Sequence, residues 1–163
     1  MPITSIGGIG HVHIVILQEF YVACQVLGRI KDTDRCSDIT SHHNNITINS
    51  ILIFRIESSI LYFNADYIRE QMMNVVDREE QRTKLVILDM SSSPYVDVAG
   101  SKMLLQVCHN LEKKQVLFKI VEARSGVRDL LRKQGLEDIT GPISRITTIQ
   151  HLVDEFSDHK NSA

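Results

Sequence analysis

The sequence predicts an α/β layer sandwich, a mixed sheet of about four to six strands flanked by about four helices. The continuous apolar run Leu85-Val86-Ile87-Leu88 is typical of a strand that is buried on both faces, as in a parallel or mixed sheet. Strand-like and helix-like segments also alternate along the chain, which indicates right-handed crossover connections. With 163 residues, of which 43% are hydrophobic and 23% charged, the chain has the size and composition of one globular domain.

The first half of the chain predicts a leader, a polar linker, a hairpin and a helix. Residues 1–25 form an atypical, glycine-rich leader, and residues 26–50 a linker with a first strand, in which 31–49 are polar and turn-forming. The runs 51–56 and 60–63 read as the two strands of a hairpin. Asn64 is a good N-cap for the next helix. The apolar residues of that helix recur at helical spacing: Ala65, Ile68, Met72, Val75 and Val76.

The second half predicts a central strand over 84–90, followed by alternating helices and strands. An apolar stripe from Ala99 to Leu111 indicates an amphipathic helix, and 116–121 a further strand. A short helix is expected to be capped by Ser125 and to stop near Gly135, before an edge strand over 142–146. The sequence Thr147-Thr148-Ile149-Gln150 matches a capping box that opens the last helix, and 158–163 read as a frayed tail.

Composition argues against several classes of protein. A formal charge of −2 gives no general attraction to nucleic acid. The three cysteines, Cys24, Cys36 and Cys108, are widely spaced and suggest neither a disulfide framework nor a thiolate zinc site. The stretch from Ile9 to Leu27 is too polar to span a membrane. Because the start also lacks the pattern of a secretory signal, we expect a cytoplasmic protein.

Two consecutive stretches, Val86-Ile87-Leu88-Asp89-Met90 and Val96-Asp97-Val98-Ala99-Gly100-Ser101-Lys102-Met103-Leu104, resemble the strand-loop-helix hallmark of STAS domains. Further stretches resemble the STAS domains of SulP anion transporters. They are Val26-Leu27-Gly28-Arg29 with Thr33, Asp34 and Ser37-Asp38, and Ile53-Phe54-Arg55-Ile56-Glu57 with Leu61-Tyr62-Phe63-Asn64-Ala65. The resemblance runs in order from residue 24 to 156, which makes it stronger than any one short motif, and it places a STAS-like domain at 51–157.

This resemblance implies a non-catalytic, regulatory domain that lies on the cytoplasmic side of an anion transporter and acts by protein interaction. Only residues 1–25 precede the stretch that resembles the usual connector from the last membrane helix. The sequence therefore suggests a detached or truncated transporter tail, or a stand-alone descendant. The expected partner is a transporter membrane domain or another regulatory protein, at the inner face of the membrane. A homodimer and a nucleotide or anion ligand stay open, and no cofactor is expected.

The candidate binding residues lie around the start of the helix after the central strand, together with the start of the next helix: Ser92, Ser93, Tyr95, Asp97, Val98, Ala99, Gly100, Ser101, Lys102 and Ser125. Free amides at a helix start suit an anion or phosphate. The simpler interpretation, which we favour, is that Asp97 caps the helix and Gly100 permits close packing. No P-loop spacing is present, and Gly7-Gly8-Ile9-Gly10 does not match a dinucleotide motif.

An anti-sigma factor antagonist is the main alternative. Signalling STAS proteins carry a phosphorylatable Ser or Thr two residues after the loop aspartate, where this chain has Ala99. The resemblance therefore disfavours this role, although Ser91, Ser92, Ser93 and Ser101 lie nearby.

Other residues with chemical potential are expected to be structural. The pairs His11/His13 and His42/His43 lack a third ligand at metal-binding spacing, so no metal site is expected. Cys108 falls on an apolar stripe and is expected to pack in the core. Asp89 ends the central strand and is expected to accept hydrogen bonds from loop amides. Since no set of acid, base and nucleophile emerges, we expect no enzyme activity.

Overall fold

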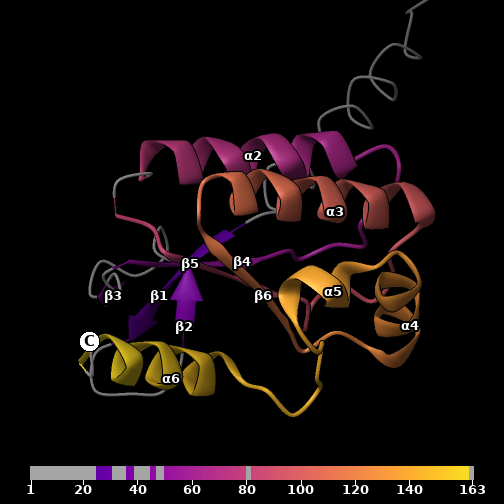
Figure 1. The fold of residues 1–163 in the computed structure, drawn as a ribbon. Helices are drawn as coiled ribbons and strands as arrows, with labels where there is room; N and C mark the ends of the chain where they lie inside the picture. Colours follow the sequence, from indigo (N-terminus) through magenta and orange to yellow (C-terminus); the bar gives the residue numbers. More distant parts are fainter. Residues whose placement is uncertain (1–24, 31–35, 39–44, 47–49, 80–81, 162–163) are drawn as a thin grey trace, which may run out of the picture.

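A computed structural model describes residues 25–30, 36–38, 45–46, 50–79 and 82–161, which form a mixed sheet with helices on both faces (Figure 1). The strands are β1 (Gln25–Ile30), β2 (Cys36–Asp38), β3 (Asn45–Ile46), β4 (Ile51–Arg55), β5 (Leu85–Asp89) and β6 (Leu117–Val121). The helices are α2 (Ala65–Arg78), α3 (Val98–Lys113), α4 (Ser125–Lys133), α5 (Leu136–Thr140) and α6 (Ile149–Asn161). The predicted fold class is confirmed.

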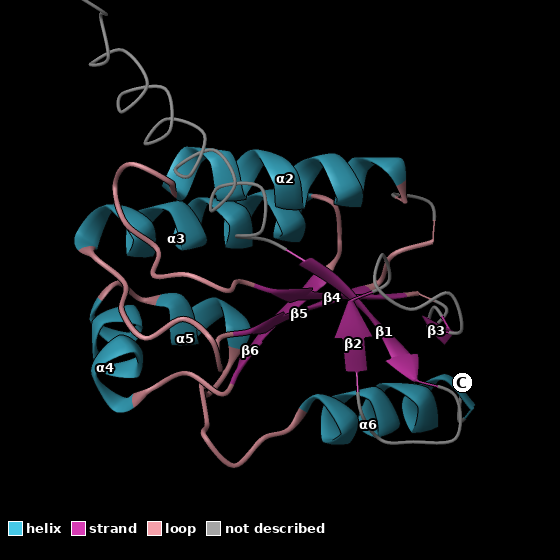
Figure 2. Cartoon of the chain, turned by 180° about the vertical axis from the view of Figure 1, so that it is seen from behind, coloured by secondary structure: helices cyan, strands magenta, loops and turns pink. Residues whose placement is uncertain are grey.

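The sheet has the order β2-β1-β4-β5-β6, and β3 pairs with β1. Strands β4, β5 and β6 run parallel, with Ile51, Leu85 and Leu117 in register. β1 pairs antiparallel with β4. Parallel neighbours need long crossovers, and α2 and α3 supply them, lying side by side on one face of the sheet (Figures 1 and 2). The loops after β4, β5 and β6 therefore all leave from one edge of the sheet, called here the carboxyl edge.

β5 is the centre of the core, and all five of its residues are buried. Val86 and Leu88 face the cluster formed with α2 and α3, whereas Leu85 and Ile87 face Leu152 and Val153 of α6. The prediction of a strand covered on both faces is confirmed. Burial of each such aliphatic side chain contributes about 1.5–3 kcal/mol, so this strand fixes the positions of the loops that follow it.

The predicted hairpin is wrong. Only 51–55 form a strand, and Ile60 makes a single parallel bridge to Val96. The side chain of Asn64 explains the difference, because it is buried and accepts a hydrogen bond from Leu61 N at 2.8 Å and donates one to Ser59 O at 2.8 Å. These bonds fold 59–64 into a tight turn. Asn64 does stand at the N-cap of α2, but its side chain bonds the turn and makes no cap bond to the helix.

The predicted edge strand over 142–146 is also wrong. Pro142 has no backbone donor, and the next amides bond side chains: Ile143 N donates to Glu137 Oε1 at 3.0 Å, and Ile146 N donates to Ser144 Oγ at 3.0 Å. Amides used in this way are not available for a strand ladder, so the segment connects α5 to α6 as an irregular loop.

Three smaller predictions shift. Thr148, one residue later than expected, caps α6 by accepting from His151 N at 3.2 Å. Ser125 is the first residue of α4, after Arg124 at the cap position. The stretch 31–49, expected to be a loop, contains β2 and β3. The end of α4 near Gly135 is confirmed, because that glycine has a positive φ of 79°.

Within the described residues, no helix combines the length and the apolar character that crossing a membrane requires.

Candidate functional site

The loop that follows β5 is anchored on both sides. The Asp89 carboxylate accepts from Ser91 N at 2.8 Å and from Arg55 Nε, on the neighbouring strand, at 2.9 Å. The Ser93 hydroxyl is fully buried and donates to Ile56 O at 2.8 Å. The expected bond from Asp89 to a loop amide is confirmed, and the ion pair with Arg55 comes in addition. The loop therefore has a fixed path from the sheet to the start of α3.

Asp97 ties the starts of α2 and α3 together. Its Oδ1 accepts from Gly100 N at 2.7 Å, which caps α3, and its Oδ2 accepts from Tyr62 N at 2.8 Å. Backbone bonds run beside it, from Ile60 N to Tyr95 O and from Asp97 N to Ile60 O, both at 3.0 Å. The turn before α2 and the loop before α3 are thus joined by one carboxylate and one parallel bridge.

Gly100 is required by this arrangement. A Cβ at this position would lie 2.6 Å from Ile60 O and 2.8 Å from Ile60 Cγ2. The expectation that Gly100 permits close packing is confirmed, and the contact is with the segment before α2.

Four exposed apolar side chains surround this junction, and we call them the aromatic edge: Tyr62, Phe63, Tyr95 and Val98. Their exposed fractions are 75%, 57%, 60% and 53%. Among the described residues, the other large hydrophobic side chains with comparable exposure are Leu117 and Ile146. The rings of Tyr62 and Phe63 meet edge to face, with centroids 5.5 Å apart. Exposed aromatic residues gathered on a rigid backbone are typical of a protein-binding surface.

The structure divides the predicted binding residues into three groups by exposure. Six are exposed around the carboxyl edge: Ser92, Tyr95, Val98, Ala99, Lys102 and Ser125. Asp97 is half-buried, and Ser93, Gly100 and Ser101 are buried, so these last three shape the site from within. The sequence did not indicate Tyr62 and Phe63 as binding residues, because their run of apolar residues is typical of a buried strand.

The first turn of α3 has few donors left for an anion. Gly100 N already donates to the Asp97 carboxylate, and Asp97 N donates to Ile60 O at 3.0 Å. Since a helix start has four free amides and a carboxylate stands among these, the geometry fits the capping interpretation.

The remaining chemical candidates are inert or outside the described residues. Cys108 is buried, and burial raises the pKa of its thiol to about 12, which fits the predicted core position. Such a thiol carries almost no thiolate at neutral pH. His11, His13, His42 and His43 lie outside the described residues.

Comparison with known families identifies the domain. The STAS domain family model matches residues 42–154, more than half of the chain. The chain belongs to the STAS domain family. This confirms the resemblance noted in the sequence, and the hallmark residues occupy the loop and helix start described above.

Similar proteins include transporters and signalling proteins. Sulfate transporter 2.1 of Arabidopsis thaliana is 33% identical over 138 residues, which are 78% of this chain and 20% of the transporter. The chain thus spans about a fifth of the length of this curated relative. The murine Solute Carrier 26 family member A9 anion transporter has a similar fold over 78% of this chain and 21% of its own, with a TM-score of 0.68 and 22% identity. An anti-sigma factor antagonist from Thermotoga maritima covers 66% of this chain and 88% of its own, with a TM-score of 0.57 and 14% identity.

Proposed function

We propose that this chain is a non-catalytic regulatory domain of the SulP type, which binds the membrane body of an anion transporter from the cytoplasmic side through the aromatic edge. The observation that carries the proposal is the aromatic edge itself, on a STAS fold whose curated relatives are sulfate transporters. A transporter body is the partner we favour because it makes up most of the length of those relatives.

Charge supports this choice of partner. Asp66, in the first turn of α2, has a side chain that is 86% exposed and pairs with Arg69 at 3.3 Å, and the Asp97 carboxylate accepts from the backbone amide of Tyr62. Cytoplasmic loops of membrane proteins carry an excess of Lys and Arg. An aromatic surface with carboxylates beside it suits such loops, because the apolar rings supply area and the carboxylates supply orientation.

The proposal is tested by replacing the STAS domain of a plant sulfate transporter with this chain in yeast that lacks sulfate uptake. We expect uptake to be retained by the chimaera and lost when Tyr62 and Tyr95 are both changed to Ser. The matched control is Ile146→Ser, because Ile146 is 89% exposed and lies on the loop before α6. Equal uptake in the double variant and in the control, at equal protein level, contradicts the proposal.

The fold likeness to an anti-sigma factor antagonist supports a second candidate. In that role the chain binds a kinase-like regulator and accepts phosphate near the start of α3. Ala99 is exposed there and has no hydroxyl. Stable binding of such a kinase, with phosphate transfer to Ser92 or Ser91, would favour this candidate over the first.

A further inference from the structure

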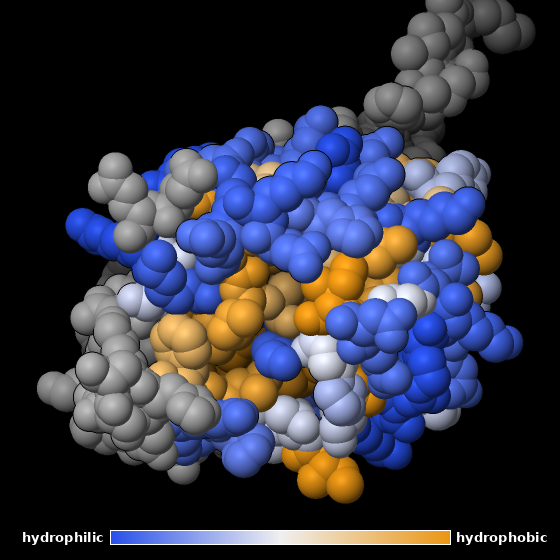
Figure 3. Space-filling view, in the orientation of Figure 1, coloured by the Kyte–Doolittle hydropathy of each residue, from blue (hydrophilic) through white to orange (hydrophobic). Residues whose placement is uncertain are grey.

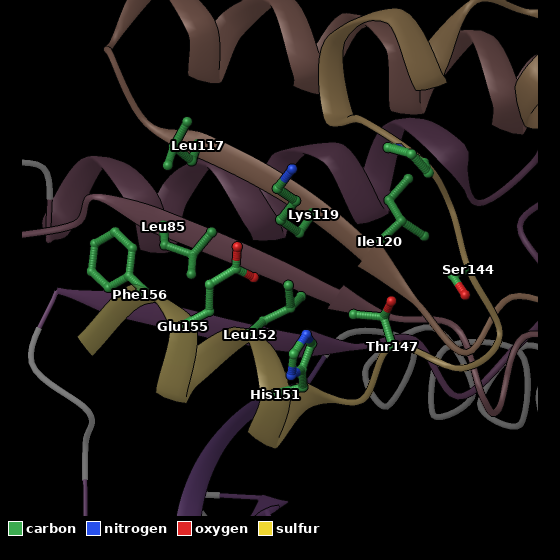
Figure 4. Close-up of a pocket in the computed structure, with 11 residues that line it drawn as sticks. Leu85, Leu117, Lys119, Ile120, Ser144, Thr147, His151, Leu152, Glu155 and Phe156 are labelled. Carbon is green, nitrogen blue, oxygen red and sulfur yellow. The ribbon is translucent and has the colours of Figure 1, made fainter. Parts of the chain in front are cut away.

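A cavity of about 300 Å³ lies on the opposite side of the sheet from α2 and α3, between β6, α6 and the loop that joins α5 to α6 (Figure 4). It exists because the hydrophobic cluster beneath α6 includes residues of β4 and β5 but only Val121 of β6. Leu117, on β6, is therefore 56% exposed. In the space-filling view, apolar surface gathers in a hollow below α3 and above α6 (Figure 3).

The lining of this cavity mixes apolar and polar side chains. Leu85, Leu117 and Phe156 lie together at one end, and at the other end Ile120 lies with Ser144 and Thr147 (Figure 4). Ligand pockets in proteins commonly combine an apolar wall with a few polar groups that set the orientation of the ligand. A mixed lining suits a small molecule that carries both apolar and charged groups, and the volume is at the lower end of the usual range for ligand pockets.

Two side chains of opposite charge, Lys119 and Glu155, also line the cavity between these ends. Lys119 is half-buried on β6 and donates to Thr140 O at 2.7 Å, which uses one of its three ammonium donors. Glu155 extends from α6 toward the strands (Figure 4). None of the ion pairs among the described residues includes either side chain. One cavity thus offers an ammonium and a carboxylate, each with capacity for a further partner.

We propose that this cavity binds a free α-amino acid with a large apolar side chain. The carboxylate of the ligand pairs with Lys119, its ammonium group pairs with Glu155, and its side chain packs between Leu117 and Phe156. A zwitterion satisfies both charges at once, whereas an anion alone meets repulsion from Glu155 and a cation alone meets repulsion from Lys119. This site is separate from the aromatic edge and does not depend on the partner proposed there.

The test is calorimetric titration of the full 163-residue chain with three probes that share one phenyl group. L-Phenylalanine carries both charges, 3-phenylpropionate lacks the ammonium, and 2-phenylethylamine lacks the carboxylate. Because a hydrogen bond to a charged group is worth a factor of about ten or more, we expect L-phenylalanine to bind at least about tenfold more tightly than either analogue.

Two variants locate the site. Glu155→Gln is expected to weaken L-phenylalanine about tenfold and to strengthen 3-phenylpropionate, because the repulsion is removed. Lys119→Met is likewise expected to weaken L-phenylalanine about tenfold and to strengthen 2-phenylethylamine, because the repulsion between the two ammonium groups is removed. Should Lys119→Met fail to fold, Glu155→Gln alone still decides, since Glu155 is exposed. Lack of saturable binding of L-phenylalanine at millimolar concentration, or equal affinity for all three probes, overturns the proposal.

Discussion

Removing the Asp97 carboxylate tests whether this group joins the starts of α2 and α3. In Asp97→Ala, α3 loses its cap bond from Gly100 N, which costs about 1 kcal/mol at a typical N-cap. The bond from Tyr62 N is lost as well. Hydrogen bonds to charged groups contribute about 1.5–3 kcal/mol, which we reduce to about 1 kcal/mol because this bond is exposed to solvent. The expected loss of unfolding free energy is therefore about 2 kcal/mol.

The conservative variant Asp97→Asn separates the two bonds. Its single side-chain oxygen retains the cap and gives up the bond from Tyr62 N, so we expect a loss of about 1 kcal/mol. The assay is urea unfolding followed by circular dichroism at pH 7. With a slope of about 1–3 kcal/mol per molar urea, the midpoint of Asp97→Ala should fall by about 1 M.

Asp66→Ala is the control for this experiment. Asp66 also lies at a helix start, but its side chain is 86% exposed and pairs with Arg69 at 3.3 Å. We expect a change of no more than about 0.5 kcal/mol. The Asp97 carboxylate does not join the two helix starts if Asp97→Ala costs as little as this control, or if Asp97→Asn costs as much as Asp97→Ala.

Three further predictions concern packing, pH and thiol reactivity. Gly100→Ala should lower the free energy of unfolding by more than about 2 kcal/mol, since the added Cβ would lie 2.6 Å from a carbonyl oxygen. Gly126→Ala is the control, because nothing lies within 4 Å of the added Cβ, and it should raise the free energy of unfolding by about 0.5–1 kcal/mol in the same urea assay. The hydrogen bond from Arg132 lowers the pKa of Glu137 in the folded chain. The stability that this carboxylate contributes is therefore present above its ordinary pKa of 4.5 and is lost as the pH falls through the lower, folded pKa. Glu137→Gln should show a shallower loss of stability below pH 4.5, measured by thermal melts. The buried Cys108 should resist iodoacetamide at pH 8 and react in urea, as mapped by mass spectrometry, and labelling of the folded chain at this residue would contradict its high pKa.

The sequence predicted the parts of the fold that depend on local patterns. Leu85–Leu88 could be recognised as a buried strand because this apolar run, bounded by Lys84 and Asp89, has the length of a strand and is too short for a helix. The run 60–63 is also continuously apolar, yet Asn64 turns it toward α2. Strand propensity is context-dependent, and a buried amide that bonds its own turn outweighs it here.

The candidate site was predictable only in part, for a related reason. The cap formed by Asp97 and the small residue at position 100 follow from the spacing of these residues, three apart at a helix start. The second bond of Asp97 joins it to Tyr62, 35 residues earlier, and Arg55 meets Asp89 across 34 residues. Such pairs depend on the register of the parallel strands, which no local pattern contains.

The parallel bridge between Ile60 and Val96 has a mechanical consequence. A partner that binds Tyr62 or Tyr95 contacts a segment that leads into α2 or α3. Because the bridge and the Asp97 carboxylate join these two segments, a shift of one segment is expected to shift the other. Both helices also pack on Val86 and Leu88 of β5, so the same contacts connect the aromatic edge to the central strand. We therefore expect the starts of α2 and α3 to move together when a partner binds, and not independently of each other.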